Sequence, residues 1–299
     1  MIREQHMITG KIIKGIGGFY YVAAEDGKIY ETKARGLFRK DGVKPLVGDD
    51  CGIEVTDGIK CLGSILSILP RRSMLIRPAV ANTDQAIVIF AVSKPEPHTG
   101  LMDRYLVGME HQDCPVTVVL NKIDADQGTG DRLAAIYGHA GYRVVQTSAK
   151  RGDGLEELRW ILKGKTSVLS GPSGVGKSSL LNALYPDHSV KTGEISERIG
   201  RGKHTTRHSE LMVAGEATFL LDTPGFSSVE LPPDLEEDGL VYCFPEMKQY
   251  IGACRFSSCR HLAEPECRVK QAVQDREIEE SRYESYVAMM ELLKQRRKY

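Results

Sequence analysis

One stretch constrains this chain more than any other, the run Gly171-Pro172-Ser173-Gly174-Val175-Gly176-Lys177-Ser178-Ser179, which fits the pattern G-x-x-x-x-G-K-[ST]. Its glycines let the backbone turn tightly, so that successive N–H groups can converge on phosphate oxygens at the start of the following helix. Lys177 is predicted to reach the β- and γ-phosphates, and Ser178 to bind Mg²⁺. A β-prone run at 166–170 precedes the loop, and helical spacing at 178–184 follows it. The stretch therefore predicts a strand, a phosphate-binding loop and a helix in that order.

Length and composition limit the class of protein. A chain of 299 residues has room for about two domains. Hydrophobic residues make up 41% and charged residues 27%, and no apolar run could span a bilayer, so we expect a globular protein with no membrane partner. Residues 1–6 lack the apolar core of a signal peptide, which predicts a cytoplasmic location. The 40 basic and 40 acidic side chains cancel, which neither requires nor excludes a nucleic-acid partner.

The first part of the chain has the pattern of a small β-barrel. Short β-prone runs separated by turn residues occupy 8–13, 19–24, 28–32, 51–55 and 62–69. A run of short strands with frequent turns favours a closed barrel, and the OB-fold is the commonest barrel of this size. A basic patch beside Phe38 consists of Lys33, Arg35, Arg39, Lys40 and Lys44. This patch is either a solvated loop or an RNA contact.

Beyond Arg71-Arg72 strands alternate with helices, which predicts a mainly parallel sheet. A strand at 116–120 ends in Asn121-Lys122-Ile123-Asp124. A carboxylate at Asp124 can accept hydrogen bonds from the ring N–H and the exocyclic amine of guanine, an arrangement that adenine does not offer. We expect Asn121 and Lys122 to fix this loop and cover the base. The alternative is an ordinary polar loop after a strand.

Two further features follow before the phosphate loop. The predicted strand at 143–146 runs into Thr147-Ser148-Ala149-Lys150, a loop whose backbone can reach the guanine oxygen. A helix is expected at 154–162, and its Trp160, the only tryptophan of the chain, is expected to pack in the core.

The segment after the phosphate loop is polar and contains Gly200-Arg201-Gly202-Lys203-His204-Thr205-Thr206-Arg207. Thr205 or Thr206 is predicted to complete the Mg²⁺ shell when a γ-phosphate is present. Two strands then lead to Asp222-Thr223-Pro224-Gly225. Here Asp222 is expected to hold Mg²⁺ through water, and the Gly225 N–H to meet the γ-phosphate. A simple type I turn is the alternative for these four residues.

Each of these motifs falls at the end of a predicted strand, which is where an α/β sheet binds its ligand. Together they predict a GTPase that binds GTP or GDP with Mg²⁺. Their order is rotated relative to Ras-like GTPases, in which the phosphate loop comes first and N-K-x-D and S-A-K come last. A circular permutation keeps the sheet and moves the chain ends to just beyond the D-T-P-G loop.

A candidate metal site follows at Cys254-x4-Cys259-x-His261-x5-Cys267. Three thiols and an imidazole can complete a tetrahedral zinc shell with no open position, so one structural Zn²⁺ is predicted. The spacing is not the usual zinc-finger spacing, and the alternative is a group of reduced cysteines. The end of the chain, 275–299, is expected to be a charged helix.

The chain resembles the bacterial ribosome small subunit-dependent GTPase A family (RsgA, also called YjeQ). The features that carry this resemblance are the rotated motif order, the barrel before it, the segment from Gly200 to Thr206, the loop Asp222-Thr223-Pro224-Gly225-Phe226 and the cysteine cluster. The resemblance covers about residues 7–299. It implies an OB-fold barrel at 1–70, a circularly permuted GTPase domain at 71–228 and a mainly helical zinc-binding domain at 229–299. It also implies a role in late maturation of the small ribosomal subunit, with that subunit and its rRNA as partners of a monomeric protein.

The position after D-x-x-G, where Ras-like enzymes carry a glutamine that orients the attacking water, is Phe226. His204 is the best candidate to replace that glutamine, because it lies two residues before Thr206. Its alternatives are a solvated residue or an RNA contact. Two other functions remain open: a zinc and barrel RNA-binding module that uses GTP as a switch with negligible turnover, and a GTPase of RNA modification or signalling.

Overall fold

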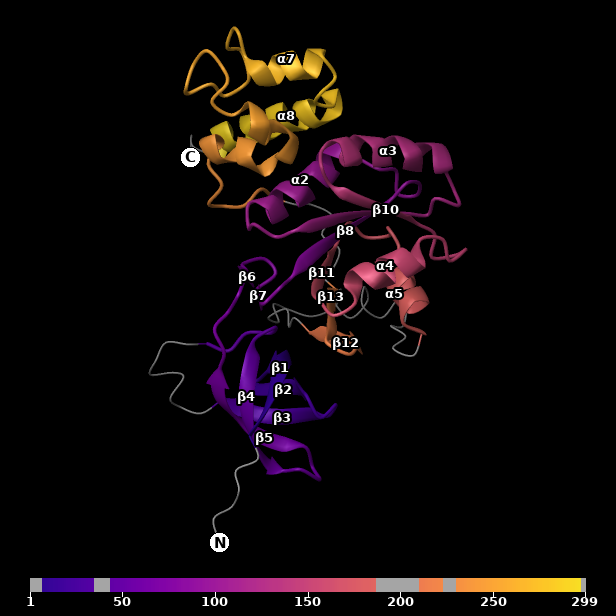
Figure 1. The fold of residues 1–299 in the computed structure, drawn as a ribbon, viewed down its shortest axis with the longest axis vertical. Coiled ribbons are helices and arrows are strands. Elements are labelled where there is room, and N and C mark those ends of the chain that lie inside the picture. Colours follow the sequence, from indigo (N-terminus) through magenta and orange to yellow (C-terminus); the bar gives the residue numbers. More distant parts are fainter. Residues whose placement is uncertain (1–6, 35–43, 187–209, 223–229, 297–299) are drawn as a thin grey trace. The chain divides into compact units, whose positions relative to one another are not determined.

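The computed structural model describes residues 7–34, 44–186, 210–222 and 230–296. The chain divides into two compact units, each made of three separate stretches of sequence. The first unit comprises 1–85, 161–169 and 191–223, and the second comprises 86–160, 170–190 and 224–299. Figure 1 shows the elements of both along the chain. The domain bounds expected from the sequence stay a prediction.

The predicted barrel is present at the start of the first unit. Its strands close in the order β1-β2-β3-β5-β4. Ile12, Val22, Ile53 and Ile65 are fully buried in the barrel core. The strands are β1 (Met7–Ile16), β2 (Phe19–Ala24), β3 (Ile29–Ala34), β4 (Asp50–Asp57) and β5 (Leu62–Ile68).

The rest of the first unit contains a short hairpin and part of the α/β sheet. The hairpin strands, β6 (Met74–Leu75) and β7 (Val80–Ala81), are too short to show a period in the sequence. Strand β11 (Thr166–Ser170), which leads into the phosphate loop, runs parallel to β13 (Thr218–Asp222). Strand β12 (Leu211–Gly215) pairs with β13 in the antiparallel direction.

The second unit contains the other parallel strands and most of the helices. Strands β8 (Gln85–Ala91), β9 (Val116–Asn121) and β10 (Arg143–Thr147) pair in parallel in the order β10-β9-β8. Helix α2 (Thr99–Glu110) joins β8 to β9, and α3 (Gln127–His139) joins β9 to β10. Figure 1 shows both helices on one side of these strands. The sequence did not reveal α3, because its first turn contains two glycines and few of its residues are apolar.

Helix α4 (Leu155–Leu162) precedes β11, and α5 (Lys177–Leu184) follows the phosphate loop. The expectation that Trp160 packs in the core is wrong, since its side chain is 71% exposed. Leu155 and Leu158 supply the buried face of α4, and the helical period turns the residue at 160 away from that face.

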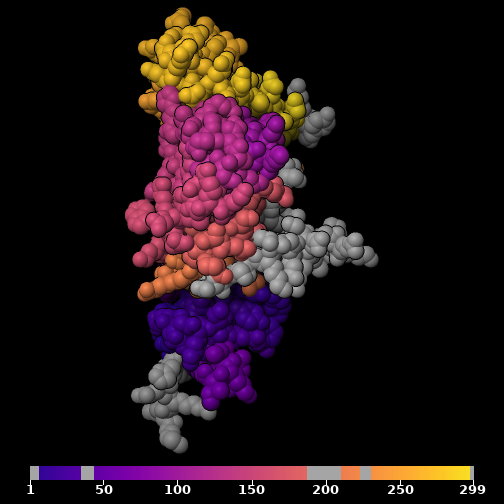
Figure 2. All heavy atoms as spheres, turned by 90° about the vertical axis from the view of Figure 1, so that its right-hand side faces the viewer, coloured from indigo at the N-terminus to yellow at the C-terminus, as the bar shows by residue number. Residues whose placement is uncertain are grey.

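The last part of the chain is mainly helical, as expected. It contains the 3₁₀ segments η2 (Glu237–Cys243) and η3 (Pro245–Tyr250) and the helices α7 (Arg268–Gln274) and α8 (Glu280–Arg296). Their apolar side chains share one core with Val107 of α2. Figure 2 shows this C-terminal part in yellow, directly against the magenta part of the same unit. No helix in the described ranges is long and apolar enough to cross a membrane.

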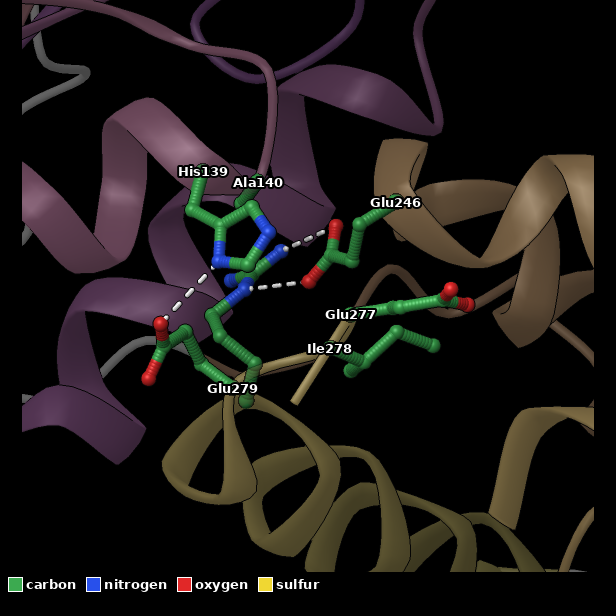
Figure 3. A pocket seen from close by; sticks show the side chains of 7 residues that line it. His139, Ala140, Glu246, Glu277, Ile278 and Glu279 are labelled. Carbon is green, nitrogen blue, oxygen red and sulfur yellow. Dashed lines mark hydrogen bonds and ion pairs between the residues drawn. The ribbon is translucent and has the colours of Figure 1, made fainter. Parts of the chain in front are cut away.

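A buried ion-pair network holds α8 and η3 to α2. Arg282 of α8 is fully buried; its Nε lies 2.7 Å from Glu246 Oε1 and its Nη1 lies 2.6 Å from Asp103 Oδ1. The Tyr137 hydroxyl of α3 also donates to Asp103 Oδ1, at 3.0 Å. Glu246 and Arg282 line the small pocket drawn in Figure 3, and none of the predicted nucleotide-binding residues lines it. Removing the arginine would leave two carboxylates buried without their cation.

We therefore predict that Arg282→Ala lowers the free energy of unfolding by about 3–5 kcal/mol, which urea titration followed by circular dichroism would measure. The matched control is Lys248→Ala, because Lys248 pairs with Glu110 at 3.3 Å but is half exposed. An exposed pair of this kind contributes about 0–1 kcal/mol. Equal losses in the two variants would contradict the role given to burial.

Candidate functional site

The phosphate loop has a backbone that only glycine can adopt at two positions. Gly171 has φ +147°, and a Cβ there would lie 2.1 Å from the carbonyl oxygen of Ile89 in β8. Gly176 has φ +97°, and a Cβ there would lie 2.4 Å from Asn121 Nδ2. Because no side chain fits at either position, the loop can pass close to β8 and to the end of β9.

The remaining residues of this loop surround the start of α5. Lys177, the first residue of α5, is buried, and its Nζ donates to the carbonyl oxygens of Gly171 at 2.8 Å and Pro172 at 2.9 Å. Both bonds curl the loop around the ammonium group. Val175 is buried, Ser178 is half-buried, and Ser173, Gly174 and Ser179 are exposed. The structure thus brings together the strand, loop and helix predicted from the sequence.

Asn121, at the end of β9, joins three loops. Its Nδ2 donates to the Val175 carbonyl oxygen of the phosphate loop at 2.9 Å. Its Oδ1 accepts from Thr147 Oγ1 at 3.3 Å and from the Ala149 N–H at 3.4 Å. The side chain is 1% exposed, so these bonds are shielded from water. One amide therefore fixes the phosphate loop and both predicted base-recognition loops to each other.

Lys122 makes a second connection to the phosphate loop. Its Nζ donates to the Gly174 carbonyl oxygen at 2.7 Å and to the carbonyl oxygen of Lys94. Burial lowers the pKa of Lys122 from its ordinary value. The segment 92–98, which follows β8, was not predicted to belong to this site. Its only signal in the sequence is the pair of prolines at 95 and 97.

Asp124 is held ready to accept hydrogen bonds. The Ser148 hydroxyl donates to Asp124 Oδ1 at 2.6 Å, and this bond lowers the pKa of the carboxyl group. Ser148 Oγ also accepts from the Arg151 N–H at 3.1 Å, which fixes the direction of the hydroxyl. Ile123 is buried between these loops, and Lys150 is exposed. Asp124 is therefore an ionised acceptor at neutral pH.

Only some of the other predicted site residues lie in the described part of the chain. Asp222 ends β13 in the first unit, as expected. His204, Thr205, Thr206, Gly225 and Phe226 lie outside the described residues, as do Arg35, Arg39 and Lys40 of the basic patch.

The four predicted metal ligands converge. One donor atom from each of Cys254, Cys259, His261 and Cys267 lies within 4.8 Å of the others. His261 Nδ1 is 3.6 Å from Cys254 Sγ and 3.4 Å from Cys267 Sγ. Helix α8 anchors this loop, because the Tyr283 hydroxyl donates to the His261 carbonyl oxygen at 2.8 Å. The cluster could hold one metal ion.

Burial favours the uncharged forms of the side chains in the cluster. Burial raises the pKa of Cys259 to about 12 and also raises that of Cys267. Burial lowers the pKa of His261, which keeps the imidazole neutral as a metal ligand must be. A divalent cation among these sulfur atoms would reverse the effect on the thiols and favour thiolates.

A phosphate loop hydrogen-bonded to an N-K-x-D loop, which in turn is hydrogen-bonded to an S-A-K loop, is typical of the P-loop GTPases. The sequence matches the family described as RsgA GTPase over residues 68–232 and the one described as RsgA N-terminal domain over residues 9–61. The chain belongs to the RsgA GTPase family, and GTP hydrolysis is the activity of that family.

Similar proteins agree over nearly the whole chain. "Small ribosomal subunit biogenesis GTPase RsgA" of Agathobacter rectalis is 49% identical, over 98% of this chain and all of that protein. The protein of the same name from Alkaliphilus metalliredigens is 47% identical, with 98% and 100% covered. The crystal structure of YjeQ from Thermotoga maritima matches with a TM-score of 0.82 at 37% identity, covering 96% of this chain and 98% of the other. YloQ, titled a circularly permuted GTPase, matches with a TM-score of 0.79 at 38% identity, covering 99% and 98%.

The close approach at Gly176 gives a direct test of the site. In Gly176→Ala, the added Cβ collides with Asn121 Nδ2, so the bond to Val175 must break. We predict that GDP affinity, measured by calorimetry, falls about ten- to a hundredfold. Gly174→Ala is the control, because Gly174 also has a positive φ, +80°, but its Cβ would meet only Pro95 Cδ at 3.7 Å. If both variants lose affinity equally, backbone strain rather than the lost amide bond is the cause.

Proposed function

We propose that this GTPase binds the small ribosomal subunit, assists its late maturation, and hydrolyses GTP to GDP and phosphate faster when the subunit is bound. The observation that carries the proposal is the direct bonding of Asn121 and Lys122 to the phosphate loop, in a chain 49% identical to a protein named for small-subunit biogenesis. We also propose that it works in the cytoplasm and as a monomer.

In the proposed nucleotide complex, the phosphate-loop N–H groups and Lys177 bind the β- and γ-phosphates. Ser178 and one of the threonines, Thr206 by preference, bind Mg²⁺, and Asp222 holds the ion through water. Gly225 donates its N–H to the γ-phosphate. Support for these roles comes from the position of Lys177 and Ser178 at the start of α5 and of Asp222 at the end of β13.

Asp124 is proposed to select guanine. In Asp124→Asn, one of the two acceptor oxygens becomes a donor that faces the donors of guanine. We predict that GTP affinity falls about tenfold to several hundredfold, with a gain for xanthosine triphosphate. Competition binding with both nucleotides would measure this change. Unaltered GTP affinity would remove Asp124 from the site.

The barrel is proposed to contact rRNA. On its outer surface Lys33 Nζ lies 4.6 Å from the ring centre of Phe19, and Lys14 Nζ lies 6.0 Å from that of Tyr21. Phe19 and Tyr21 are two residues apart on β2, so their rings share one face. Aromatic rings next to ammonium groups suit bases and phosphates of single-stranded RNA.

One structural Zn²⁺ is proposed at the cysteine cluster. Tetrahedral zinc with Zn–S bonds of about 2.3 Å and Zn–N bonds of about 2.0 Å needs ligand atoms about 3.5–3.8 Å apart. The separations of 3.4, 3.6 and 4.0 Å among His261, Cys254 and Cys267 support this fit. All four ligands come from the protein, so the ion has no open position for catalysis.

We predict that Cys259→Ala loses stoichiometric zinc and loosens residues after about 231, since zinc binding at such sites contributes on the order of 10–16 kcal/mol. Elemental analysis and hydrogen exchange would measure the two effects. Cys243→Ala is the control, because Cys243 is buried in the same core but is not among the converging ligands. Absence of zinc from the purified parent protein would refute the assignment.

His204 is proposed to orient the attacking water when the small subunit is bound. Phe226 cannot do so, and unassisted hydrolysis is expected to be no faster than about 10⁻⁴ to 10⁻² s⁻¹. We predict that His204→Ala abolishes subunit-stimulated turnover while GTP and subunit binding stay nearly intact. Full stimulation in this variant would point to a group supplied by the ribosome.

The proposal as a whole is tested by GTP turnover with and without purified ribosomal subunits. Stimulation by small but not large subunits is expected. An RNA-binding module that uses GTP only as a switch would show negligible turnover with either subunit. A GTPase of RNA modification or signalling would fail to sediment with small subunits.

A further inference from the structure

Trp160 is a large apolar side chain that neither the nucleotide site nor the metal cluster uses. It is the only tryptophan of the chain, and it is 71% exposed on α4. Its exposed neighbours on the same helix, Glu156, Glu157 and Arg159, are charged. The indole is therefore a single aromatic surface and not part of a wide apolar patch of the kind that a protein partner buries.

A guanidinium group lies next to the indole. The Cζ atom of Arg143, the first residue of β10, is 5.5 Å from the ring centre of Trp160. Arg143 Nη2 also donates to Glu157 Oε1 at 2.9 Å. That bond uses one of the five N–H donors of the guanidinium, and the arginine side chain is 46% exposed. Arg143 is thus held beside the ring while it keeps donors for another ligand.

The helix that carries Trp160 is also bonded to the helix of the phosphate loop. Arg159 Nη2 donates to the carbonyl oxygen of Leu184 at 3.2 Å, and Leu184 is the last residue of α5. The segment 187–209, which contains His204 and the threonines, follows within a few residues in the chain. Arg159, the residue before Trp160, thus joins α4 to the end of α5.

We propose that Trp160 and Arg143 form a stacking site for one unpaired nucleotide of ribosomal RNA. The base stacks on the exposed indole, and its phosphate accepts hydrogen bonds from Arg143. The indole ring suits the flat base of a nucleotide, and the guanidinium beside it suits the phosphate. Stacking of a base on an aromatic side chain contributes about 1–3 kcal/mol. This inference rests on the proposed small-subunit function.

The sole tryptophan makes the site measurable. Titration of the full-length protein with single-stranded hexaadenylate, with excitation at a wavelength that selects indole, is expected to quench the emission of Trp160. Arg143→Ala is expected to weaken that quenching. No quenching at saturating oligonucleotide, with binding verified by anisotropy of a labelled hexaadenylate, would overturn the proposal.

Sedimentation with small subunits tests the same residues in the complex. Trp160→Ala is expected to lose about five- to a hundredfold in subunit affinity, and Trp160→Phe to lose less. The control is Tyr242→Ala, which removes another exposed aromatic side chain, 55% exposed on η2.

Unchanged affinity of Trp160→Ala for small subunits would overturn the inference. Reduced affinity without quenching by the oligonucleotide would assign Trp160 to a protein contact instead. If the parent chain does not bind small subunits at all, the proposed function fails, whereas quenching by hexaadenylate still tests stacking.

Discussion

The amide side chain of Asn121 is the interaction on which the nucleotide site depends. It lies at the end of β9, is shielded from water, and bonds to the phosphate loop on one side and to the 147–149 loop on the other. The backbone of Gly176 passes so close to this amide that a methyl group would not fit between them. The residues predicted to recognise the base and those predicted to bind phosphate are therefore joined in one hydrogen-bonded assembly, to which Lys122 adds the segment after β8.

These bonds connect loops that are far apart in the sequence, which explains why the motif order can be rotated. What the site needs is that β8, β9 and β10 present their carboxyl ends together with the phosphate loop. In the permuted order D-T-P-G is the last of the GTPase motifs, and the chain continues from it directly into the C-terminal part. That part is attached again to α2 through Arg282, and within it Tyr283 joins α8 to the loop of the predicted metal ligands. The C-terminal part is thus joined to α2 by buried charges as well as by the chain itself.

Much of this architecture could be predicted from the sequence. The barrel strands and the strand-loop-helix around Lys177 have strong periodicity and turn signals, and the four predicted metal ligands lie close together in the sequence. Helix α3 could not be predicted, because the two glycines in its first turn obscure the helical spacing of its apolar residues. Arg282, Asp103 and Glu246 could not be found, since a buried ion pair between distant residues leaves no local pattern. The expectation for Trp160 is wrong because its position on the polar side of α4, and not its residue type, decides its exposure.

The central claim is that Asn121 positions the phosphate loop and does not itself recognise the base. The direct test measures the effect of Asn121→Ala on GDP binding in the parent chain and on xanthosine diphosphate binding in the Asp124→Asn background. Because the same buried amide bond is lost in each case, affinity should fall by the same factor, about ten- to a hundredfold, for GDP in the parent chain and for xanthosine diphosphate in the Asp124→Asn background. A decrease confined to GDP, or none at all, would contradict the account.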